Sequence, residues 1–125
     1  MLIEGMLPEP ANDQEDETMQ TNKYVVELWH EPGISPLSNP TYRQMAQRTH
    51  EKMPALMEKH GITMLGDYHL DPEHRSILIF EARSVEDVRD LLYESGYMGW
   101  CDGRIYPTTP LSQMHKWATA QDIEG

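Results

Sequence analysis

The chain has 125 residues, of which 38% are hydrophobic, and a formal net charge of -11 at pH 7. This length accommodates one domain with a modest core, and the low apolar content favours burial against a partner. An acidic surface without a basic stripe repels phosphate groups, so we expect no nucleic acid and no membrane among its partners. No apolar run approaches the ~20 residues of a membrane-spanning helix, and the single cysteine, Cys101, cannot form an internal disulfide. These features predict a cytoplasmic protein.

The first 22 residues form an acidic leader that contains six acidic side chains and no Lys or Arg. Such a composition is typical of a segment that is flexible or docked on a partner. We therefore place the domain at residues 23–110 and treat residues 111–125 as a C-terminal tail. Within the tail, residues 111–120 predict a short helix with Met114 and Trp117 on one side.

Residues 23–31 alternate between two kinds of side chain, as a strand with two different faces does. A helix is predicted over residues 40–60, because Asn39 is a good N-cap, Pro40 suits the first helical position and Gly61 is a good stop. Its apolar residues recur at helical spacing and predict one buried stripe. Pro54 lies inside this helix and removes one backbone hydrogen bond, so a kink is expected there.

Residues 62–82 are the most informative part of the chain, because they indicate two strands, 63–69 and 76–82, joined by a polar turn. Ser84 then caps a second helix, with Asp87 in a position like that of a capping box, and Gly96 ends it. A short strand at 103–106 follows and is closed by Pro107. This order of elements predicts an α+β, ferredoxin-like βαββαβ sandwich, with a four-stranded antiparallel sheet and two helices on one face.

The alternation of side chains sorts the strands into two faces. The more uniformly apolar set should lie under the helices: Tyr24, Val26, Leu28, Leu78, Phe80 and Ala82. The opposite set lines the open face: Val25, Glu27, Trp29, Ile77, Ile79 and Glu81. This face is too apolar to stay bare. We therefore expect a homodimer, or a higher homo-oligomer, whose open faces pair as a dimeric α/β barrel.

Four polar residues are the candidate catalytic group: His69, Glu27, Glu81 and Asp67. Glu27 and Glu81 lie on neighbouring strands in the covered space, where a carboxylate can acquire the raised pKa of a general acid or base. Asp67 and His69 share one face of their strand, and the pattern does not decide which face that is. If they reach the barrel, a histidine joins three carboxylates for proton transfer. The alternatives are that Asp67 and His69 are ordinary strand-end residues, and that Glu27 and Glu81 are exposed at the edge or paired with Arg83 or Arg104.

Trp29, Trp100 and Tyr68 are the candidate walls of a ligand pocket. Trp100 and Cys101 belong to the glycine-punctuated segment 95–103, and loops of this kind often form the mouth of a pocket. The aromatic side chains of this segment can equally cap the end of the core. Cys101 has neither a basic neighbour nor a helix N-terminus to activate it, so we expect no nucleophilic role.

Six histidines raise the question of a metal site, but the chain has no HExxH and no paired-cysteine signature. His30 and His69 end two parallel strands at the same end of the sheet, with one strand between them. His50 lies beside the Pro54 kink. We therefore treat His30, His50 and His69 as candidate ligands of a divalent transition metal. His60, at the C-terminal end of its helix, is expected to be structural.

Three segments of the chain resemble small uncharacterised families of the dimeric α/β-barrel superfamily: LGDYH at 65–69, LIFEARSVEDVRDLL at 78–92 and RIYPTTP at 104–110. That superfamily includes muconolactone isomerases, antibiotic-biosynthesis monooxygenases and a ferredoxin-like nickel-binding group. The resemblance covers about residues 23–110 and brings no shared catalytic motif. It implies the ferredoxin-like fold, and it marks His50 and His69 as positions where such families also place histidine.

Three functions follow from these observations. The first is a dimeric α/β-barrel protein that binds or converts a small molecule at a polar site on the sheet face, with the reaction left open. The second is a non-catalytic dimerisation or accessory subunit, in which the acidic leader and the tail with Trp117 dock a partner. The third is metal binding through histidines. A buried pocket favours the first function, whereas solvent-facing Glu27 and Glu81 over a filled barrel favour the second.

Overall fold

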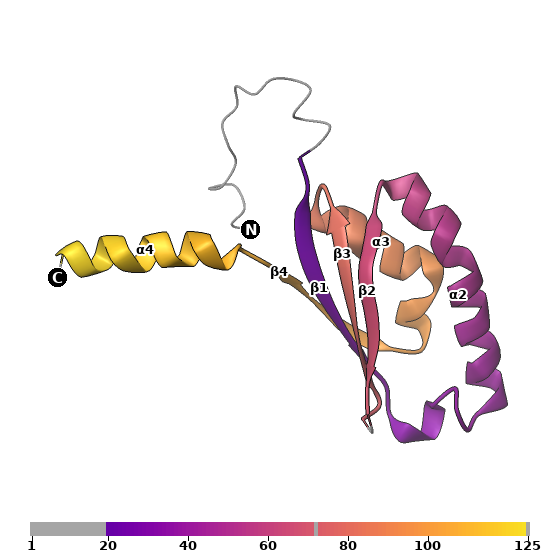
Figure 1. The fold of residues 1–125 in the computed structure, drawn as a ribbon. Helices are drawn as coiled ribbons and strands as arrows, with labels where there is room; N and C mark the ends of the chain where they lie inside the picture. Colours follow the sequence, from indigo (N-terminus) through magenta and orange to yellow (C-terminus); the bar gives the residue numbers. More distant parts are fainter. Residues whose placement is uncertain (1–19, 72, 125) are drawn as a thin grey trace.

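The computed structural model describes residues 20–71 and 73–124, and Figure 1 shows their arrangement. The strands are β1 (Asn22–Trp29), β2 (Thr63–Leu70), β3 (Arg75–Ala82) and β4 (Asp102–Pro107), and the helices are α2 (Pro40–His60), α3 (Val85–Ser95) and α4 (Leu111–Glu124). Two short 3-10 helices, η3 (Pro32–Ile34) and η4 (Tyr97–Gly99), lie in the connections. Each predicted element of the domain is present with nearly its expected bounds, whereas the predicted leader falls largely outside the described residues.

The four strands form one open antiparallel sheet in the order β2-β3-β1-β4. The predicted α+β class and four-stranded antiparallel sheet are therefore confirmed. Helices α2 and α3 cover one face of the sheet, and α4 lies on the other side (Figure 1). The tail thus adds a third helix, which is longer than the short one expected at residues 111–120.

The predicted helix caps are also confirmed. The side-chain oxygen of Asn39 accepts hydrogen bonds from the first amides of α2, and the helix continues through Pro54 until Gly61 ends it with a φ of 68°. Helix α3 begins at Ser84, whose hydroxyl oxygen accepts a hydrogen bond from the amide of Asp87 at 3.2 Å. It ends at Gly96, which has a φ of 97°. These local signals fix where each helix lies along the chain.

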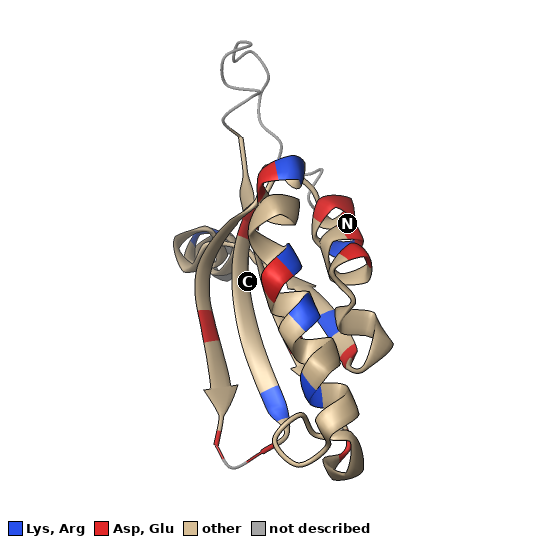
Figure 2. Ribbon diagram, turned by 90° about the vertical axis from the view of Figure 1, so that its right-hand side faces the viewer, with Lys and Arg blue, Asp and Glu red and all other residues tan. Residues whose placement is uncertain are grey.

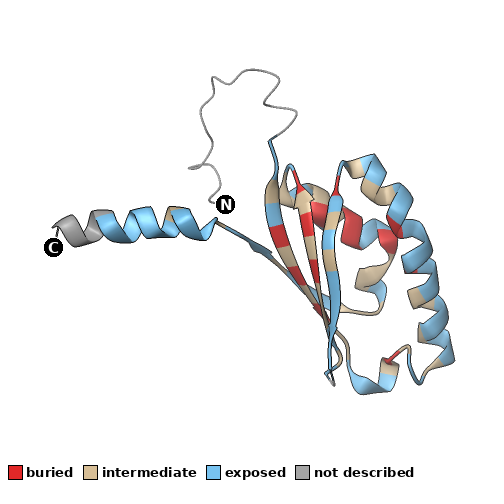
Figure 3. Ribbon diagram, viewed as in Figure 1, coloured by how far each residue is buried: buried red, intermediate tan, exposed pale blue. Residues whose placement is uncertain are grey.

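The core lies between the sheet and the two helices that cover it (Figure 3). The six residues predicted to lie under the helices are all buried, with at most 4% of their surface exposed. On the opposite face Val25 lies across from Ile79, and Glu27 lies across from Ile77. These four side chains are only partly buried, so the sorting of the two faces is confirmed.

Both acidic and basic residues occur along α2 and α3 (Figure 2). Where the helices meet, Nε2 of His60 lies 3.1 Å from Oε1 of Glu94, and Nζ of Lys59 lies 3.1 Å from the same oxygen. The hydrogen bond to His60, followed by that to Lys59, lowers the pKa of Glu94 below its ordinary value. His60 therefore connects α2 with α3, as the expected structural role requires. In the described ranges, no helix has the length and apolar character needed to cross a membrane.

Replacement of Gly96 by Ala should destabilise the fold. A Cβ at this position would lie 3.2 Å from Oγ1 of Thr49, on a backbone whose positive φ disfavours L-residues. We expect Gly96→Ala to lower the free energy of unfolding by about 1 kcal/mol, as measured by urea denaturation. Gly33→Ala is the control, because a Cβ there meets no atom within 4 Å. Equal stability of the two variants would contradict the left-handed helix end at Gly96.

Candidate functional site

A cavity of about 270 Å³ lies at the end of the sheet where β1 and β2 stop and β3 begins. We call it the histidine pocket, because three imidazoles from three segments line it: His30 follows β1, His69 lies in β2 and His74 precedes β3. The rest of its wall is mainly apolar and consists of Leu28, Ser35, Pro36, Leu37, Ser76, Tyr97, Trp100 and Cys101.

The roof of the pocket is the connection between β1 and α2, and α2 itself holds this connection in place. Arg43 donates hydrogen bonds to the carbonyl oxygens of Pro36 at 3.1 Å and Leu37 at 3.4 Å. The carbonyl of Ser35 accepts a hydrogen bond from the amide of Asn39 at 2.9 Å. Ser35 is fully buried. The roof is therefore a fixed part of the fold, built from backbone bonds on both sides of Ser35 and from the guanidinium of Arg43.

His30 is the central polar group of the pocket. Its ring centroid lies 5.3 Å from that of His74 and 5.8 Å from that of Trp100. Its Nε2 atom is buried and has no hydrogen-bond partner within the described part of the chain. Burial, followed by the charges of His74 and His69, lowers the pKa of His30 below 6.5. At neutral pH the pocket thus contains an uncharged imidazole whose Nε2 is free to bind.

His69 has a carboxylate partner. Its Nδ1 lies 2.8 Å from Oδ1 of Asp71, in the turn that follows β2. This contact favours the tautomer in which Nδ1 carries the proton and Nε2 is the acceptor. His69 also faces Ser76 across the β2–β3 pair. Two of the three pocket histidines thus differ in their surroundings: His30 is partly buried and its Nε2 has no partner among the described residues, whereas His69 is half-exposed and oriented by an aspartate.

An aromatic wall closes the side of the pocket. Nε1 of Trp100 donates a hydrogen bond to Oγ1 of Thr49 at 3.2 Å, and Thr49 is buried in α2. Tyr97 stacks on Trp100 with a centroid distance of 5.7 Å, and burial is the main reason that its pKa is raised. Burial also raises the pKa of the Cys101 thiol to about 12, so the thiol stays protonated and poorly nucleophilic at neutral pH. The two stacked rings and the thiol thus make this side of the pocket largely apolar.

The structure separates the four candidate catalytic residues onto opposite faces of the sheet. Asp67 pairs with Leu78, and His69 pairs with Ser76, so both lie on the side that α2 and α3 cover. Glu27 and Glu81 lie on the open face, opposite Ile77 and Lys23. The predicted histidine with three carboxylates is therefore not assembled in one chain, and only His69 reaches the histidine pocket.

The carboxylates of the open face have their own partners. The guanidinium of Arg75 donates to Glu27, whose other oxygen accepts a hydrogen bond from the hydroxyl of Tyr106 at 3.1 Å. Glu81 accepts a hydrogen bond from Oγ1 of Thr21 at 2.8 Å. These contacts give Glu27 and Glu81 a structural role at the sheet surface.

The three candidate wall residues are also divided. Trp100 lines the pocket, whereas Trp29 lies on the open face, where the guanidinium carbon of Arg75 is 5.5 Å from the centre of its ring. Tyr68 pairs with Ile77 on the same open face and is 61% exposed. These positions place Trp29 and Tyr68 outside the pocket.

The candidate metal ligands are placed in two hollows. His30 and His69 line the histidine pocket together, whereas His50 lies in a second, shallower hollow on the other side of Tyr97 and Trp100. In the described ranges, no group of three or more His, Cys, Asp or Glu side chains is arranged to hold a metal ion. The predicted trio of His30, His50 and His69 is therefore not brought to one point.

His74 is the pocket residue to which the sequence analysis assigned no role. The amide of His30 donates a hydrogen bond to the carbonyl of His74 at 3.2 Å, and Trp29 pairs with Arg75 in the ladder directly before it. The signal that predicts this neighbour is the antiparallel register: one step beyond Trp29 and Arg75 are His30 and His74.

Comparisons with known proteins give no family for this chain. No family model matches it, and no curated protein matches it. Among solved structures, it is similar to an uncharacterized protein from Thermotoga maritima, with 11% sequence identity and a TM-score of 0.40 over 72% of this chain and 100% of that chain. This likeness carries no functional argument, so the site has to be interpreted from its own geometry.

The lowered pKa of His30 should make the stability of the fold depend on pH. Because the folded chain binds a proton at His30 less readily than the unfolded chain does, protonation favours unfolding as the pH falls through about 6.5. We expect the free energy of unfolding to decrease between about pH 7.5 and pH 5.5, and His30→Gln to reduce this decrease. Urea denaturation at several pH values measures both slopes. An identical slope in His30→Gln would show that other groups cause the pH dependence.

Proposed function

We propose that the chain binds a small molecule in the histidine pocket and that His30 recognises it. The observation that carries this proposal is the buried Nε2 of His30, which lacks a partner in the described residues although it lies in a mainly apolar cavity. A buried polar atom without a hydrogen bond costs about 1–3 kcal/mol. A ligand that donates a hydrogen bond to this nitrogen removes the cost, and an apolar pocket with a few converging polar groups is typical of ligand sites.

The size and chemistry of the pocket define a class of ligand. Its volume of about 270 Å³ is slightly below the roughly 300–1,000 Å³ of common ligand pockets, which favours a small molecule. The stacked Tyr97 and Trp100 favour a flat ring. In the neutral tautomer that carries its proton on Nδ1, Nε2 of His30 accepts a hydrogen bond. For this tautomer, the class that fits best is a phenol or an enol, whose hydroxyl donates.

The same geometry supports conversion of such a ligand by proton transfer. Since His30 is uncharged at neutral pH, it can accept the proton of the ligand hydroxyl. His69, oriented by Asp71, is a second group in the same pocket that can exchange a proton with the ligand. We therefore extend the proposal to a proton-transfer reaction between two histidines. An enol–keto interconversion balances when His69 enters with protons on both ring nitrogens and Asp71 as its partner: His69 gives its Nε2 proton to the ligand carbon, and His30 takes the hydroxyl proton.

We further propose that the domain is a ferredoxin-like sandwich and that two copies pair through their open faces as a dimeric α/β barrel. The order of elements and of strands supports the first statement. The partly exposed apolar side chains of the open face support the second. Arg75 and Tyr106 already bind Glu27 on this face. We therefore assign dimerisation to the open face and ligand binding to the histidine pocket. The single, partly buried Cys101 suits a reducing cytoplasm.

Phenol and anisole test the ligand proposal, because both carry the same ring and only phenol carries a hydroxyl that can donate to His30. We expect phenol to bind about tenfold more tightly than anisole, the effect of one hydrogen bond of ~1.4 kcal/mol. In His30→Phe this ratio should fall to about one. Two-dimensional NMR of the histidine side chains measures affinity and location together.

His50→Phe is the matched control, because His50 lines the neighbouring hollow and should leave the ratio unchanged. Equal binding of phenol and anisole to the parent protein would overturn the assignment of His30 as the recognising group. If neither compound binds while zinc chloride shifts the signals of His30, His69 and His74 together, the metal function replaces the small-molecule function.

The homodimer has its own test. Val25→Asp combined with Ile79→Asp places two charges on the open face and removes roughly 1.5–3 kcal/mol of burial at each site. We expect a monomer or an insoluble protein by light scattering. Gln44→Asp combined with Ala55→Asp adds the same charge on exposed positions of α2 and should leave the dimer intact. A well-folded dimer of the Val25 and Ile79 variant would contradict an interface on the open face.

A further inference from the structure

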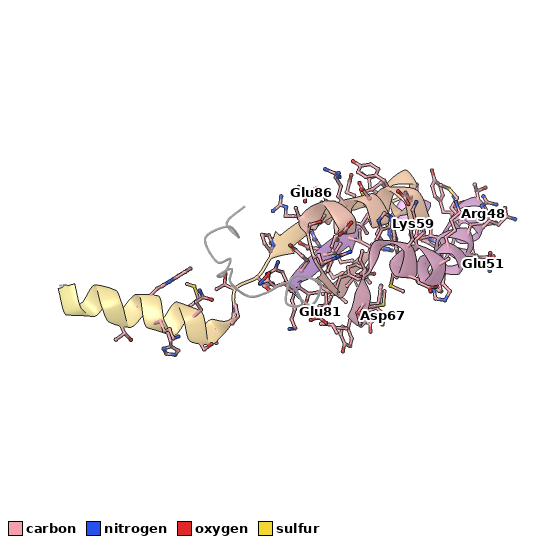
Figure 4. The ribbon with its side chains drawn as sticks, turned by 90° about the horizontal axis from the view of Figure 1, so that it is seen from above. Arg48, Glu51, Lys59, Asp67, Glu81 and Glu86 are labelled. Carbon is pink, nitrogen blue, oxygen red and sulfur yellow. The ribbon has the colours of Figure 1, made fainter. Side chains whose placement is uncertain are left out.

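Among the described residues, helix α4 does not pack against another helix or strand. It leaves the sheet on the open side and extends clear of the layer formed by α2 and α3 (Figures 1 and 4). Within the described residues it makes no extended contact with any other helix or strand. An isolated helix of 14 residues is at the limit of stability in water. The helix therefore requires packing against something outside its own domain.

The surface that α4 offers is an apolar stripe, which we define as Leu111, Met114 and Trp117. These side chains recur at a spacing of three residues, so they lie along one side of the helix. They are 76%, 44% and 49% exposed, respectively. Large apolar groups that gather on one side of an unpacked helix mark an interaction surface.

The linker holds α4 away from its own sheet. Only residues 108–110 separate β4 from α4. Oγ1 of Thr108 donates a hydrogen bond to the carbonyl of Lys23 in β1 at 2.7 Å. The carbonyl of Pro110 accepts hydrogen bonds from the amides of Gln113 and Met114, at 2.9 and 3.3 Å, and so begins the helix. With Pro107 and Pro110 restricting its backbone, this linker directs α4 into the space in front of the open face.

We propose that α4 is an exchanged arm: a second copy of the chain sits on the open face, and the stripe of each α4 packs against the other copy. The sheet and α4 bound the space in front of the open face. A second copy in this space covers both the open face and the apolar stripe of α4. When a two-fold axis relates the two copies, each copy contributes its α4 to the other, and the assembly is closed at two copies. The inference rests on the homodimer proposed above and is independent of the ligand proposal.

The area of the open face supports this arrangement. Three strands of 8 residues and one of 6, at ~3.3 Å per residue and ~4.8 Å apart, give a face of roughly 500 Å². A stable interface buries about 800 Å² per partner, so the sheet face alone falls short. An arm of 14 residues, ~21 Å long and ~10 Å wide, adds roughly 200 Å² and receives about as much from the other copy. Sheet and arms together reach the area that a stable dimer needs.

Full-length chains with a charge on the stripe test the arm. We expect Met114→Glu and Trp117→Glu each to weaken the dimer at least about tenfold in sedimentation equilibrium, since each places a charge in an apolar contact. Ser112→Glu and Thr119→Glu add the same charge on the opposite side of α4 and should change the dissociation constant less than about twofold. Circular dichroism of each variant shows whether the domain remains folded.

A second measurement distinguishes an exchanged arm from an arm that folds back on its own sheet. In protein labelled with 5-fluorotryptophan, the fluorine signal assigned to Trp117 should move on dilution in step with the fraction of dimer. A Trp117 signal that does not change on dilution, although the dimer dissociates, would overturn the exchange of α4 between copies. If Met114→Glu and Trp117→Glu both leave the dimer unchanged, the exchanged arm is overturned but the homodimer stands. If the parent chain is monomeric at all concentrations, the homodimer itself is overturned.

Discussion

The register shift in β2 decides which chemistry this fold can carry. Thr63 pairs with Glu81 on the open face, but the ladder shifts between Met64 and Gly66 and leaves Leu65 unpaired. Because side chains alternate with a period of two, one extra residue moves every later side chain to the other face. Without the shift, Asp67 and His69 would join Glu27 and Glu81 on the open face. With it, His69 lies on the helix side and completes the histidine pocket.

The pocket depends on a second constraint, the meeting of three chain segments at one end of the sheet. In this topology β1 and β2 run parallel on either side of β3, so His30 and His69 leave their strands at the same end, and His74 lies where β3 enters. Their separation by β3 would leave a shallow groove. The roof that Arg43 holds over them and the wall of Tyr97 and Trp100 turn this groove into a cavity. The burial that results is also the main reason that the pKa of His30 is lowered.

The sequence predicted what local chemistry and alternation determine. Asn39, Gly61, Ser84 and Gly96 marked the helix ends, and the alternation in β1 and β3 sorted the two faces, because a cap or a period acts through neighbouring residues. The register shift in β2 was not predicted from the sequence, although a glycine inside a strand, here Gly66, is a common sign of a bulge. The enclosure of the pocket depends on contacts between Arg43, Thr49 and Trp100, which are far apart in sequence, and no local pattern encodes them. The direction of α4 likewise involves a contact between residues far apart in sequence, the hydrogen bond from Thr108 to the carbonyl of Lys23 in β1.

The two sides of the sheet therefore differ in what they need: the pocket side needs a ligand for His30, and the open face needs a second copy to cover it. The residues that line the histidine pocket lie on the side of α2 and α3, away from the open face that the proposed second copy covers. The open face carries Glu27 bound by Arg75 and Tyr106, together with apolar residues that a second copy can cover. Loss of the dimer should thus leave the pocket chemically complete. The two sides share three strands, because Leu28, His69 and Ser76 line the pocket whereas their neighbours Trp29, Tyr68 and Ile77 lie on the open face. A ligand and a second copy can therefore act on each other through the positions of these strands.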